Sequence, residues 1–451
     1  MTNVSATRKA LIVGLGKSGV SAARHLAARG WQLAATDSRP SPPGREAIDA
    51  LVAKDDRCFG KLDLALLENA ELVVASPGVS LAEPVLVAAA ARGIDIVGDV
   101  ELFAREVEAP VVGITGTNGK STVTTLVGRM AARAGRRVAV GGNLGTPVLE
   151  LLEQPKPELY VLELSSFQLE TTRSLRLVAA AALNLSADHL DRHGSMTAYA
   201  AAKARIFLRC GVAVVNADDA WTQQMPALAG ADAARRVVNF SIEGATGVEY
   251  TLVEHRGESW LAIRGEPVLA VSAMRIAGLH NAANALAAMA LGEACQLPLP
   301  AMLDELREFA GLAHRSQWVG EKRGVRYIND SKGTNVGATI AAVSGMPGSL
   351  ILIAGGDGKG QDFSPLAKAL ANRVRVAVLI GRDASQLATA LAGVCELRHA
   401  ASLEAAVQEA ARVAVAGETV LLSPACASLD MFRDYAERGE RFAAAVEGLT
   451  T

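Results

Sequence analysis

The stretch VVGITGTNGKSTVTTLV, residues 111–127, decides the fold of this chain. A β-branched run at 111–114 predicts a strand and the pattern of 121–134 predicts an amphipathic helix, so a glycine-rich loop joins a strand directly to a helix. The backbone N–H groups of such a loop and the N-terminus of its helix bind phosphate groups. Lys120 can reach the terminal phosphates of a nucleotide, and the Ser121 hydroxyl can bind Mg²⁺.

The spacing of this loop departs from the strict phosphate-binding pattern. Five residues before Gly119 stands Ile114, where the strict pattern has a glycine. The short form Gly-x-x-Gly-Lys-Ser-Thr between a strand and a helix still predicts a nucleotide site. A glycine turn with a purely structural role stays open as the alternative.

Short apolar strands alternate with helices along the rest of the chain. Continuous apolar strands separated by helices are typical of parallel sheets that are covered on both faces, so we expect an α/β protein. The predicted strands are residues 10–14, 33–36, 72–75, 111–114, 160–164, 178–183, 212–216, 350–354, 376–380 and 419–422.

The length of 451 residues predicts two or three domains. We expect a Rossmann-like N-terminal domain at 1–98 and a central P-loop-type ATPase α/β domain at 99–311. The central domain contains a polar, alternating stretch at 236–275 that predicts a small β-meander. A C-terminal Rossmann-like α/β domain at 312–451 completes the prediction.

Composition excludes several classes of function. Lys and Arg number 45 against 47 Asp and Glu, a net charge of −2, and only 4% of residues are aromatic. Such a chain lacks both the basic surplus and the stacking surfaces of nucleic-acid binders, so we expect no nucleic-acid partner. No apolar run is long enough to span a bilayer and the N-terminus lacks a signal peptide, so we expect a cytoplasmic protein without membrane insertion.

The five cysteines are dispersed along the chain. Without a short-spaced pair they predict neither a disulfide framework nor a structural zinc site. They are Cys58, Cys210, Cys295, Cys395 and Cys426.

A second glycine motif follows the first predicted strand. Gly14, Gly16 and Gly19 form Gly-x-Gly-x-x-Gly, and Asp37 ends the next strand. This arrangement fits a dinucleotide fingerprint, with the acidic residue on a ribose hydroxyl. Two alternatives stay open: glycines that only permit close helix–sheet packing, and a loop that binds a different nucleotide diphosphate. Ser76-Pro77-Gly78 would lie at the same sheet edge.

An acid and an imidazole end two strands of the middle segment. Glu163 lies near the end of the strand at 160–164, and His189 follows the strand at 178–183. The carboxyl ends of parallel strands line the crevice that contains the phosphate loop. Glu163 is therefore placed to hold Mg²⁺, and His189 is a candidate ligand of a second metal ion or an ordinary loop histidine.

Three loops of the last segment also follow predicted strands. They are residues 329–335, 355–359 and 423–428, and we expect Ser428 to begin a helix. Lysines and helix N-termini at one sheet edge suit the recognition of carboxylates. Together the loops predict a binding face.

A set of motifs in this order resembles the Mur ligases of peptidoglycan synthesis, and the resemblance covers essentially the whole chain. Within that family the ending SPACASLDMFRDYAERGERF resembles the branch that adds D-glutamate. The motifs are GTNGKST (116–122), ELSSFQLE (163–170), NLSADHLDRH (184–193), GLHNAANALAA (278–288), HRSQWV (314–319), INDSKGTNVGAT (328–339), AGGDGKG (354–360) and LLSPACASLD (421–430).

The resemblance implies an ATP-dependent ligase whose three domains bind, in order, a UDP-sugar, ATP and the incoming amino acid. Its substrates would be UDP-N-acetylmuramoyl-L-alanine (UDP-MurNAc-L-Ala) and D-glutamate, and its products the amide, ADP and phosphate. It further implies two Mg²⁺ sites and a CO₂-derived carbamate on Lys203. We expect a monomer.

Carried over position by position, the family's functional residues fall into five sets. The catalytic set is Lys120, Glu163, His189 and Lys203. The metal ligands would be Ser121, Glu163, His189 and Lys203 as its carbamate. ATP would contact Gly116, Thr117, Asn118, Gly119, Lys120, Ser121, Thr122, Asn284, Arg315 and Asp330. The UDP-sugar would contact Ser18, Asp37, Ser38, Arg39, Gly78 and Asn143. D-glutamate would contact Lys332, Thr334, Lys359, Ser428, Leu429 and Tyr435.

The chain departs from the family pattern at a few positions. Tyr435 stands where relatives often have phenylalanine, and Ser18 and Ser38 stand where threonines are frequent. The segment from His189 to Lys203 is one residue shorter than in some relatives. Three other classes stay open as alternatives: an NAD-dependent dehydrogenase built on the first glycine motif, a folylpolyglutamate-synthase-like ligase, and a nucleotide-binding module without enzymatic activity.

Overall fold

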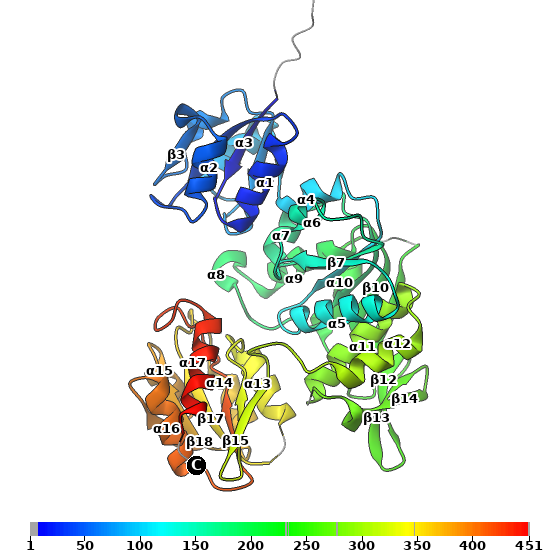
Figure 1. The fold of residues 1–451 in the computed structure, drawn as a ribbon, viewed down its shortest axis with the longest axis vertical. Helices are drawn as coiled ribbons and strands as arrows, with labels where there is room; N and C mark the ends of the chain where they lie inside the picture. Colours follow the sequence, from blue (N-terminus) through cyan, green and yellow to red (C-terminus); the bar gives the residue numbers. More distant parts are fainter. Residues whose placement is uncertain (1–7, 231, 233, 277, 347, 450–451) are drawn as a thin grey trace, which may run out of the picture.

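The computed structural model describes residues 8–230, 232, 234–276, 278–346 and 348–449, and it contains three α/β bodies (Figure 1). In Figure 1 the N-terminal body is blue, the middle body cyan to green, and the C-terminal body yellow to red. Each body is built around one sheet that lies within one predicted domain. Residues 1–7 and 450–451, which the outer domain bounds include, lie outside the described residues, and the boundaries stay predictions.

The N-terminal sheet is entirely parallel. Its order is β3-β2-β1-β4-β5, so the chain reverses its direction of winding between β1 and β4, where α/β sheets bind ligands. Its strands are β1 (Lys9–Val13), β2 (Gln32–Asp37), β3 (Arg57–Phe59), β4 (Leu72–Ala75) and β5 (Asp95–Val97). Its helices are α1 (Lys17–Ala27), α2 (Arg45–Leu51), α3 (Pro84–Ala91) and the 3₁₀ turns η1 (Lys54–Asp56) and η2 (Leu64–Leu67).

The middle sheet has the order β14-β13-β12-β11-β10-β9-β6-β8-β7. Its strands are β6 (Val111–Thr115), β7 (Val138–Gly142), β8 (Leu159–Glu163), β9 (Leu177–Ala182), β10 (Cys210–Asn216), β11 (Arg236–Ser241), β12 (Tyr250–His255), β13 (Glu258–Ile263) and β14 (Glu266–Ala270). Its helices are α4 (Asp99–Ala104), α5 (Lys120–Arg133), α6 (Val148–Leu151), α7 (Ser166–Glu170), α8 (Leu190–His193), α9 (Met196–Ala204), η3 (Arg205–Phe207), α10 (Ala220–Leu228), η4 (Val271–Ala273), α11 (Leu279–Ala294) and α12 (Leu299–Glu308).

The predicted meander at 236–275 was wrong for its first strand. β11 pairs in parallel with β10, and only β12, β13 and β14 form the antiparallel meander. The reason is α10, which connects β10 to β11 and returns the chain in the same direction. The meander extends the parallel sheet, because β12 pairs in parallel with β11 over two residue pairs.

The C-terminal sheet has the order β15-β16-β20-β17-β18-β19, with β15 antiparallel to β16 and the other strands parallel. Its strands are β15 (Gln317–Lys322), β16 (Val325–Asn329), β17 (Leu350–Gly355), β18 (Val374–Ile380), β19 (Glu396–His399) and β20 (Thr419–Leu422). Its helices are α13 (Val336–Gly345), α14 (Ser364–Leu370), α15 (Ala384–Ala390), α16 (Leu403–Val413) and α17 (Tyr435–Glu447). α13 to α15 pack on one face, and α16 and α17 on the other.

The expected helix at Ser428 was wrong. The Ser428 carbonyl accepts hydrogen bonds from the N–H groups of Met431 (3.1 Å) and Phe432 (2.8 Å), which closes a single turn, and the helix α17 begins only at Tyr435. Asp434 caps that helix, because its side chain accepts from the Glu437 N–H. The capping aspartate therefore moves the helix start seven residues downstream.

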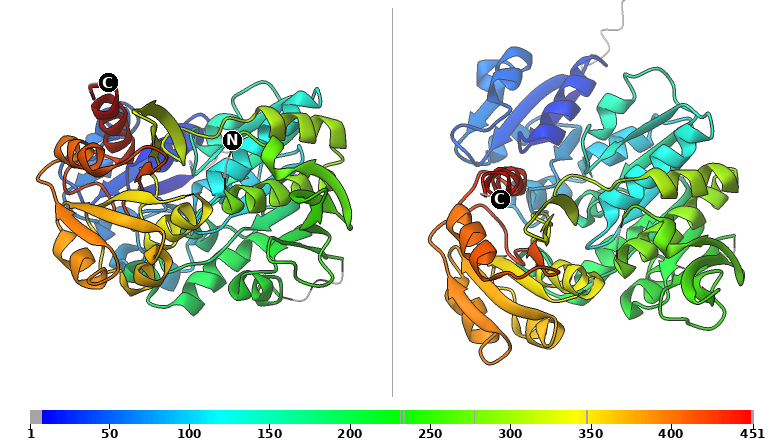
Figure 2. Two further views of the ribbon diagram at one scale, coloured as in Figure 1. Left: turned by 90° about the horizontal axis from the view of Figure 1, so that it is seen from below. Right: turned by 60° about the horizontal axis from the view of Figure 1, so that its bottom comes forward.

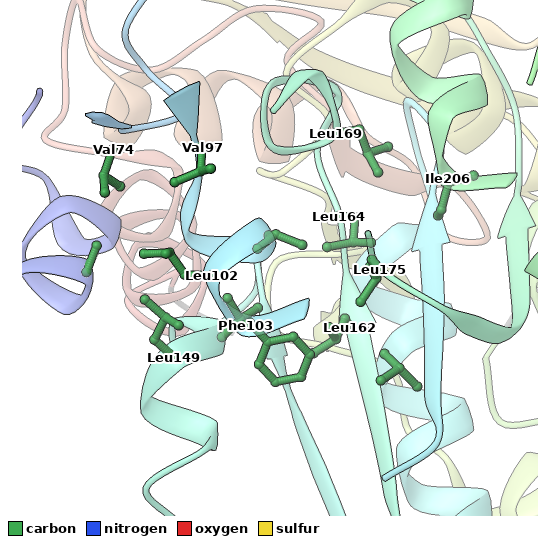
Figure 3. Packing of buried hydrophobic residues seen from close by; sticks show 14 of the residues in the cluster. Val74, Val97, Leu102, Phe103, Leu149, Leu162, Leu164, Leu169, Leu175 and Ile206 are labelled. Atoms are coloured by element: carbon green, nitrogen blue, oxygen red, sulfur yellow. The ribbon is translucent and has the colours of Figure 1, made fainter. Parts of the chain in front are cut away.

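An apolar cluster joins the N-terminal body to the middle body. Val74 of β4 and Val97 of β5 pack with Leu102 and Phe103 of α4 (Figure 3). Phe103 is fully buried and meets the Tyr160 ring edge-on, with 5.1 Å between ring centroids. Burying a phenylalanine side chain contributes about 1.5–3 kcal/mol, so this contact helps to hold the two bodies together.

The two further views in Figure 2 show the yellow and red C-terminal body beside the other two. No helix among the described residues is both long and apolar enough to cross a lipid bilayer.

Candidate active site

The phosphate loop links β6 to α5, and its backbone is fastened to the neighbouring strand end. The Thr117 N–H donates to the Asn184 carbonyl (2.9 Å), and the Asn118 N–H donates to Asn184 Oδ1 (2.8 Å). Gly119 has φ +83°, and a Cβ on it would lie 2.4 Å from Asn284 Oδ1. Only glycine fits this position, because both the left-handed backbone and the neighbouring amide exclude a side chain.

Lys120 curves back over this loop. Its Nζ donates to the carbonyls of Gly116 (2.9 Å) and Thr117 (2.9 Å). Burial lowers the pKa of Lys120, while the nearby Glu163 carboxylate opposes that shift. The loop therefore holds a desolvated cation, which interacts strongly with a phosphate group.

Ser121 and Glu163 form the centre of the site. Ile114 of β6 lies opposite Glu163 of β8 in the parallel register, so Glu163 reaches the start of α5. Ser121 Oγ donates to Glu163 Oε2 (2.6 Å), and Asn143 Nδ2 donates to Glu163 Oε1 (2.6 Å). Burial raises the pKa of Glu163, but the charge of Lys120 and these hydrogen bonds outweigh it, so the pKa is lowered.

This carboxylate–hydroxyl pair fits a magnesium ion chemically. Mg²⁺ binds hard oxygen ligands and takes only one or two carboxylates from a protein. Arg315 Nη2 also donates to Ser121 Oγ (2.8 Å), so a cation from the C-terminal body reaches the same hydroxyl. Lys120, Arg315 and the Ser121–Glu163 pair thus meet at the point where terminal phosphates would lie.

His189 and Lys203 also lie near the loop, and Lys203 shares the Gly116 carbonyl with Lys120. His189 has φ +53° at the start of α8, and its side chain is 40% exposed. Lys203 is 2% exposed, and its Nζ donates to the Gly116 carbonyl (2.9 Å) and lies 4.7 Å from the Tyr199 ring centroid. In the part of the chain that the structure describes, no three His, Cys, Asp or Glu side chains gather as a metal site.

An aromatic cluster behind His189 was not assigned from the sequence. The His193 ring stacks on Phe167 with 5.4 Å between centroids, and Phe167 meets His189 edge-on at 5.0 Å. His193 Nε2 hydrogen-bonds Ser166 Oγ (3.0 Å), which ties α8 to α7. Both His189 and His193 belong to the motif at 184–193. Only the fold shows that His193 packs on Phe167, which in turn contacts His189.

A cavity of about 320 Å³ opens between the middle and C-terminal bodies beside the loop. Six of the ten residues expected at ATP line it, and Lys332 lines it as well. The six are Asn118, Gly119, Thr122, Asn284, Arg315 and Asp330. Apolar side chains that were not predicted from the sequence line the rest of the cavity, among them Phe240, Ile242, Ile276 and Leu312.

A separate cleft of about 640 Å³ lies between the N-terminal and middle bodies. All six residues expected at the UDP-sugar line it: Ser18, Asp37, Ser38, Arg39, Gly78 and Asn143. The Asp37 carboxylate accepts hydrogen bonds from the Leu15 N–H (2.7 Å) and from the Arg39 N–H and guanidinium. It therefore organises the glycine loop and Arg39 in addition to facing the cleft.

Four of the residues expected at D-glutamate lie in the three C-terminal loops, Leu429 directly follows the third loop, and Tyr435 is the first residue of α17. Lys332 Nζ stands 3.8 Å from the Tyr435 ring centroid, and burial, with the charge of Arg315, lowers the pKa of Lys332 to about 8. Ser428 is buried, whereas Leu429 is 69% exposed. The remaining two are Thr334, which precedes the cap of α13, and Lys359, which is exposed in the glycine-rich loop after β17.

Arg438 supports two of these loops and was not assigned from the sequence. The side chain is 0% exposed, and its guanidinium donates to Ser331 Oγ (3.0 Å), the Ser331 carbonyl (2.8 Å) and the Cys426 carbonyl (3.2 Å). It thus fastens the loop after β16 to the loop after β20. No local pattern distinguishes this arginine from its exposed neighbours.

Comparison with known proteins gives matches along the whole chain. Three family models match it in order: the Mur ligase MurD-like N-terminal domain at residues 8–98, the Mur ligase middle domain at 114–292, and the Mur ligase glutamate ligase domain at 314–426. Similar curated proteins include UDP-N-acetylmuramoylalanine–D-glutamate ligases of two bacteria. That of Nitrosococcus oceani is 53% identical over 97% of this chain and 96% of its own length.

The second relative, from Pseudomonas aeruginosa, is 49% identical over 100% of both chains. Among solved structures, a pseudomurein peptide ligase type C of Methanothermus fervidus has a TM-score of 0.61. It covers 98% of this chain and 100% of its own at 18% identity, and so shares the fold.

Proposed function

The chain belongs to the Mur ligase family, and we propose that it joins D-glutamate to UDP-MurNAc-L-Ala with ATP, releasing ADP and phosphate. It is an ATP-dependent ligase of peptidoglycan precursor synthesis. One observation supports the reaction most directly. The Ser121–Glu163 pair connects the two cavities. Arg315, which lines the 320 Å³ cavity, hydrogen-bonds Ser121, and Asn143, which lines the 640 Å³ cleft, hydrogen-bonds Glu163. Lys120 lies beside this pair.

The first step activates the carboxylate of the sugar substrate. A carboxylate oxygen attacks the γ-phosphorus of ATP, the bond to the β-phosphate oxygen breaks, and an acyl phosphate and ADP result. Lys120 and Arg315 lower the repulsion between these anions by placing two cations at the transferring group. Ser121 and Glu163 would hold Mg²⁺, which neutralises developing charge on the phosphates when it is bound.

The second step forms the amide bond. The neutral amino group of D-glutamate attacks the acyl carbon and forms the C–N bond, the bond to phosphate breaks, and the nitrogen releases one proton. Lys332, Lys359 and Ser428 offer charge and hydrogen-bond donors for the two carboxylates of D-glutamate. Thr334, Leu429 and Tyr435 complete the face that we assign to this substrate. The UDP-sugar lies in the cleft lined by Arg39 and its neighbours.

The buried Lys203 supports the carbamate that the family resemblance implies. We infer that its amine, as a neutral group, attacks the carbon of CO₂, forms an N–C bond and releases a proton to solvent. Burial and the charge of Lys120 lower the pKa of Lys203 well below its ordinary value, which makes the neutral amine available. The anion would then share a second Mg²⁺ with His189.

We also propose that the protein is a monomer that acts in the cytoplasm. Its proposed substrates, nucleotides and a free amino acid, are water-soluble small molecules, which supports the second of these proposals.

A substrate panel tests the proposal. The protein is incubated with ATP, Mg²⁺, UDP-MurNAc-L-Ala and one amino acid at a time, and phosphate release and the new amide are measured. We expect release with D-glutamate that depends on the sugar substrate, and none with L-glutamate, L-lysine or meso-diaminopimelate. Equal release with another amino acid, or release with a folate acceptor in place of the sugar, would contradict the proposal.

A further inference from the structure

α13 begins directly after the loop that carries Lys332 and Thr334, and its cap is Asn335. Asn335 Oδ1 accepts from the Ala338 N–H (2.8 Å), the usual hydrogen bond of an asparagine at a helix N-terminus. Asn335 is 4% exposed. A cap on a surface helix does not need to be buried, so a second role is required to explain its position.

The same amide also reaches the middle body. Asn335 Nδ2 donates to Asn118 Oδ1 (3.4 Å), and Asn118 Nδ2 donates to Asn335 Oδ1 (3.5 Å). Asn335 Nδ2 further donates to Asp188 Oδ2 (3.4 Å). These bonds are long, but they join the C-terminal body to the phosphate loop and to the residue before His189.

Two glycines of α13 seat the helix against the middle body. A Cβ at Gly337 would lie 2.8 Å from Ser186 Oγ and 3.1 Å from Ser186 Cβ. A Cβ at Gly345 would lie 2.9 Å from His280 Nδ1 and 3.3 Å from the Gly278 Cα. A methyl group at the first or last turn of the helix would therefore require Ser186 or His280 to shift.

Local structure does not require these glycines. Neither has a positive φ, and each costs a helix up to about 1 kcal/mol relative to alanine. The close contact between the two bodies is the remaining reason for both. Asn335, Gly337 and Gly345 thus form one docking surface, which we name the α13 seat.

We propose that Asn335 is a positioning residue that, through the α13 seat, couples the D-glutamate loop to the phosphate loop. This inference rests on the proposed function for the identity of the two loops. The acyl phosphate would form at the phosphate loop, whereas the D-glutamate that carries the attacking amine would be held by the loop before α13. Amide formation requires reacting atoms at about 3–3.5 Å, so a rigid contact between the loops sets the rate of that step.

A double-mutant cycle tests the coupling between Asn335 and Asn118. We expect Asn335→Ala and Asn118→Ala each to lower kcat/KM for the amino acid about tenfold, and the double variant to be no slower than the slower single variant. Multiplying effects, with a loss of about a hundredfold in the double variant, would overturn the coupling. Binding of UDP-MurNAc-L-Ala should be unchanged in all three.

Asn335→Ser separates positioning from capping, because serine also caps helices but is too short to reach Asn118. We expect its thermal midpoint to exceed that of Asn335→Ala, because the cap is kept, and its activity to be as low as that of Asn335→Ala. Full activity of Asn335→Ser would reduce Asn335 to a cap and overturn the proposal.

The glycines provide an independent measurement. Gly345→Ala favours the helix but obstructs the seat, so we expect an unchanged or higher thermal midpoint with kcat lowered at least tenfold. Ser344→Ala, at an exposed position of the same turn, is the matched control and should behave as wild type. Wild-type kcat in both Gly345→Ala and Gly337→Ala would overturn the seat. All variants are measured with the amino acid that the wild type ligates, so a failure of the D-glutamate assignment is recognised separately.

Discussion

At the scale of single residues, Lys120 shows a conflict between stability and function. Its half-buried ammonium lies against the phosphate loop, and desolvation lowers its pKa. We expect Lys120→Ala to lower kcat by about a hundred- to a thousandfold, as the loss of one preorganised charge does. Because the variant also removes a desolvated charge, its thermal midpoint should stay level or rise.

Phosphate release and a thermal melt measure the two effects. Lys156→Ala is the control, since Lys156 is exposed and pairs with Glu108 at the surface. Activity of folded Lys120→Ala near that of Lys156→Ala would contradict the assignment.

The carbamate proposal is also decided at one residue. We expect Lys203→Ala to be nearly inactive, because the anion that the second metal ion needs is lost. Formate or acetate should restore part of the activity by occupying the vacated space, whereas chloride at equal ionic strength should not. Full activity of Lys203→Ala without any added carboxylate would refute the role.

Tyr435 departs from the family pattern and contacts Lys332, which we assign to the binding of D-glutamate. Its ring centroid lies 3.8 Å from Lys332 Nζ, a cation–π distance. The contact uses the ring and not the hydroxyl, so Tyr435→Phe should leave KM for D-glutamate within about twofold. Tyr435→Leu should raise that KM about threefold to tenfold, since such contacts contribute about 0.5–2 kcal/mol. Steady-state kinetics at saturating ATP provide the comparison, and equal KM values for the two variants would contradict the role of the ring.

At the scale of elements, Arg438 makes α17 the support of the substrate loops. Its guanidinium joins the loops after β16 and β20 from a fully buried position. The guanidinium spreads its donors over three nitrogens that face Ser331 and Cys426, whereas an ammonium has its three N–H donors on one nitrogen and cannot span these acceptors. We therefore expect Arg438→Lys to lose about 2–4 kcal/mol in stability. KM for D-glutamate should rise more than KM for ATP.

Urea unfolding and steady-state kinetics check this expectation. Arg441→Lys is the matched control, because Arg441 lies on the same helix and is exposed, where it pairs with Glu404. Equal stability losses in the two variants would mean that the buried guanidinium is not a support.

The elements themselves were largely predictable. Strands such as β4 and β20 have the predicted bounds, because each is a continuous buried apolar run. Short strands with mixed patterns, β3 and β19, were not identified, since three or four partly exposed residues carry no clear period. The false helix at Ser428 arose because a turn and a helix begin alike in sequence.

At the scale of the whole molecule, His280 connects two bodies and makes their contact sensitive to pH. Burial lowers its pKa from 6.5 to about 4. The unfolded chain binds this proton below about pH 6.5 and the folded chain only near pH 4, so stability is lost as pH falls through that window. Within this window, each unit by which the pH falls lowers the free energy of unfolding by about 1.4 kcal/mol.

His280→Gln removes this titration. Between pH 7.5 and 5.5 we expect the wild type to lose about 1.4 kcal/mol more stability than the variant. Parallel pH profiles in urea unfolding would contradict the neutral, buried state of His280. The comparison of slopes holds even if the variant is less stable at every pH.

The sequence by itself determined the βα alternation, the phosphate loop and the residues at the ends of its strands, because these depend on local periodicity and on glycine, lysine and serine at fixed spacing. Tertiary structure alone decided which loops meet. Arg315 lies 194 positions from Ser121, and Asn335 lies 217 from Asn118, yet each pair is hydrogen-bonded. Tertiary structure also decided that Arg438 is buried and that β11 pairs in parallel with β10. Such contacts follow from how whole sheets and helices pack, and no local pattern names the distant partner.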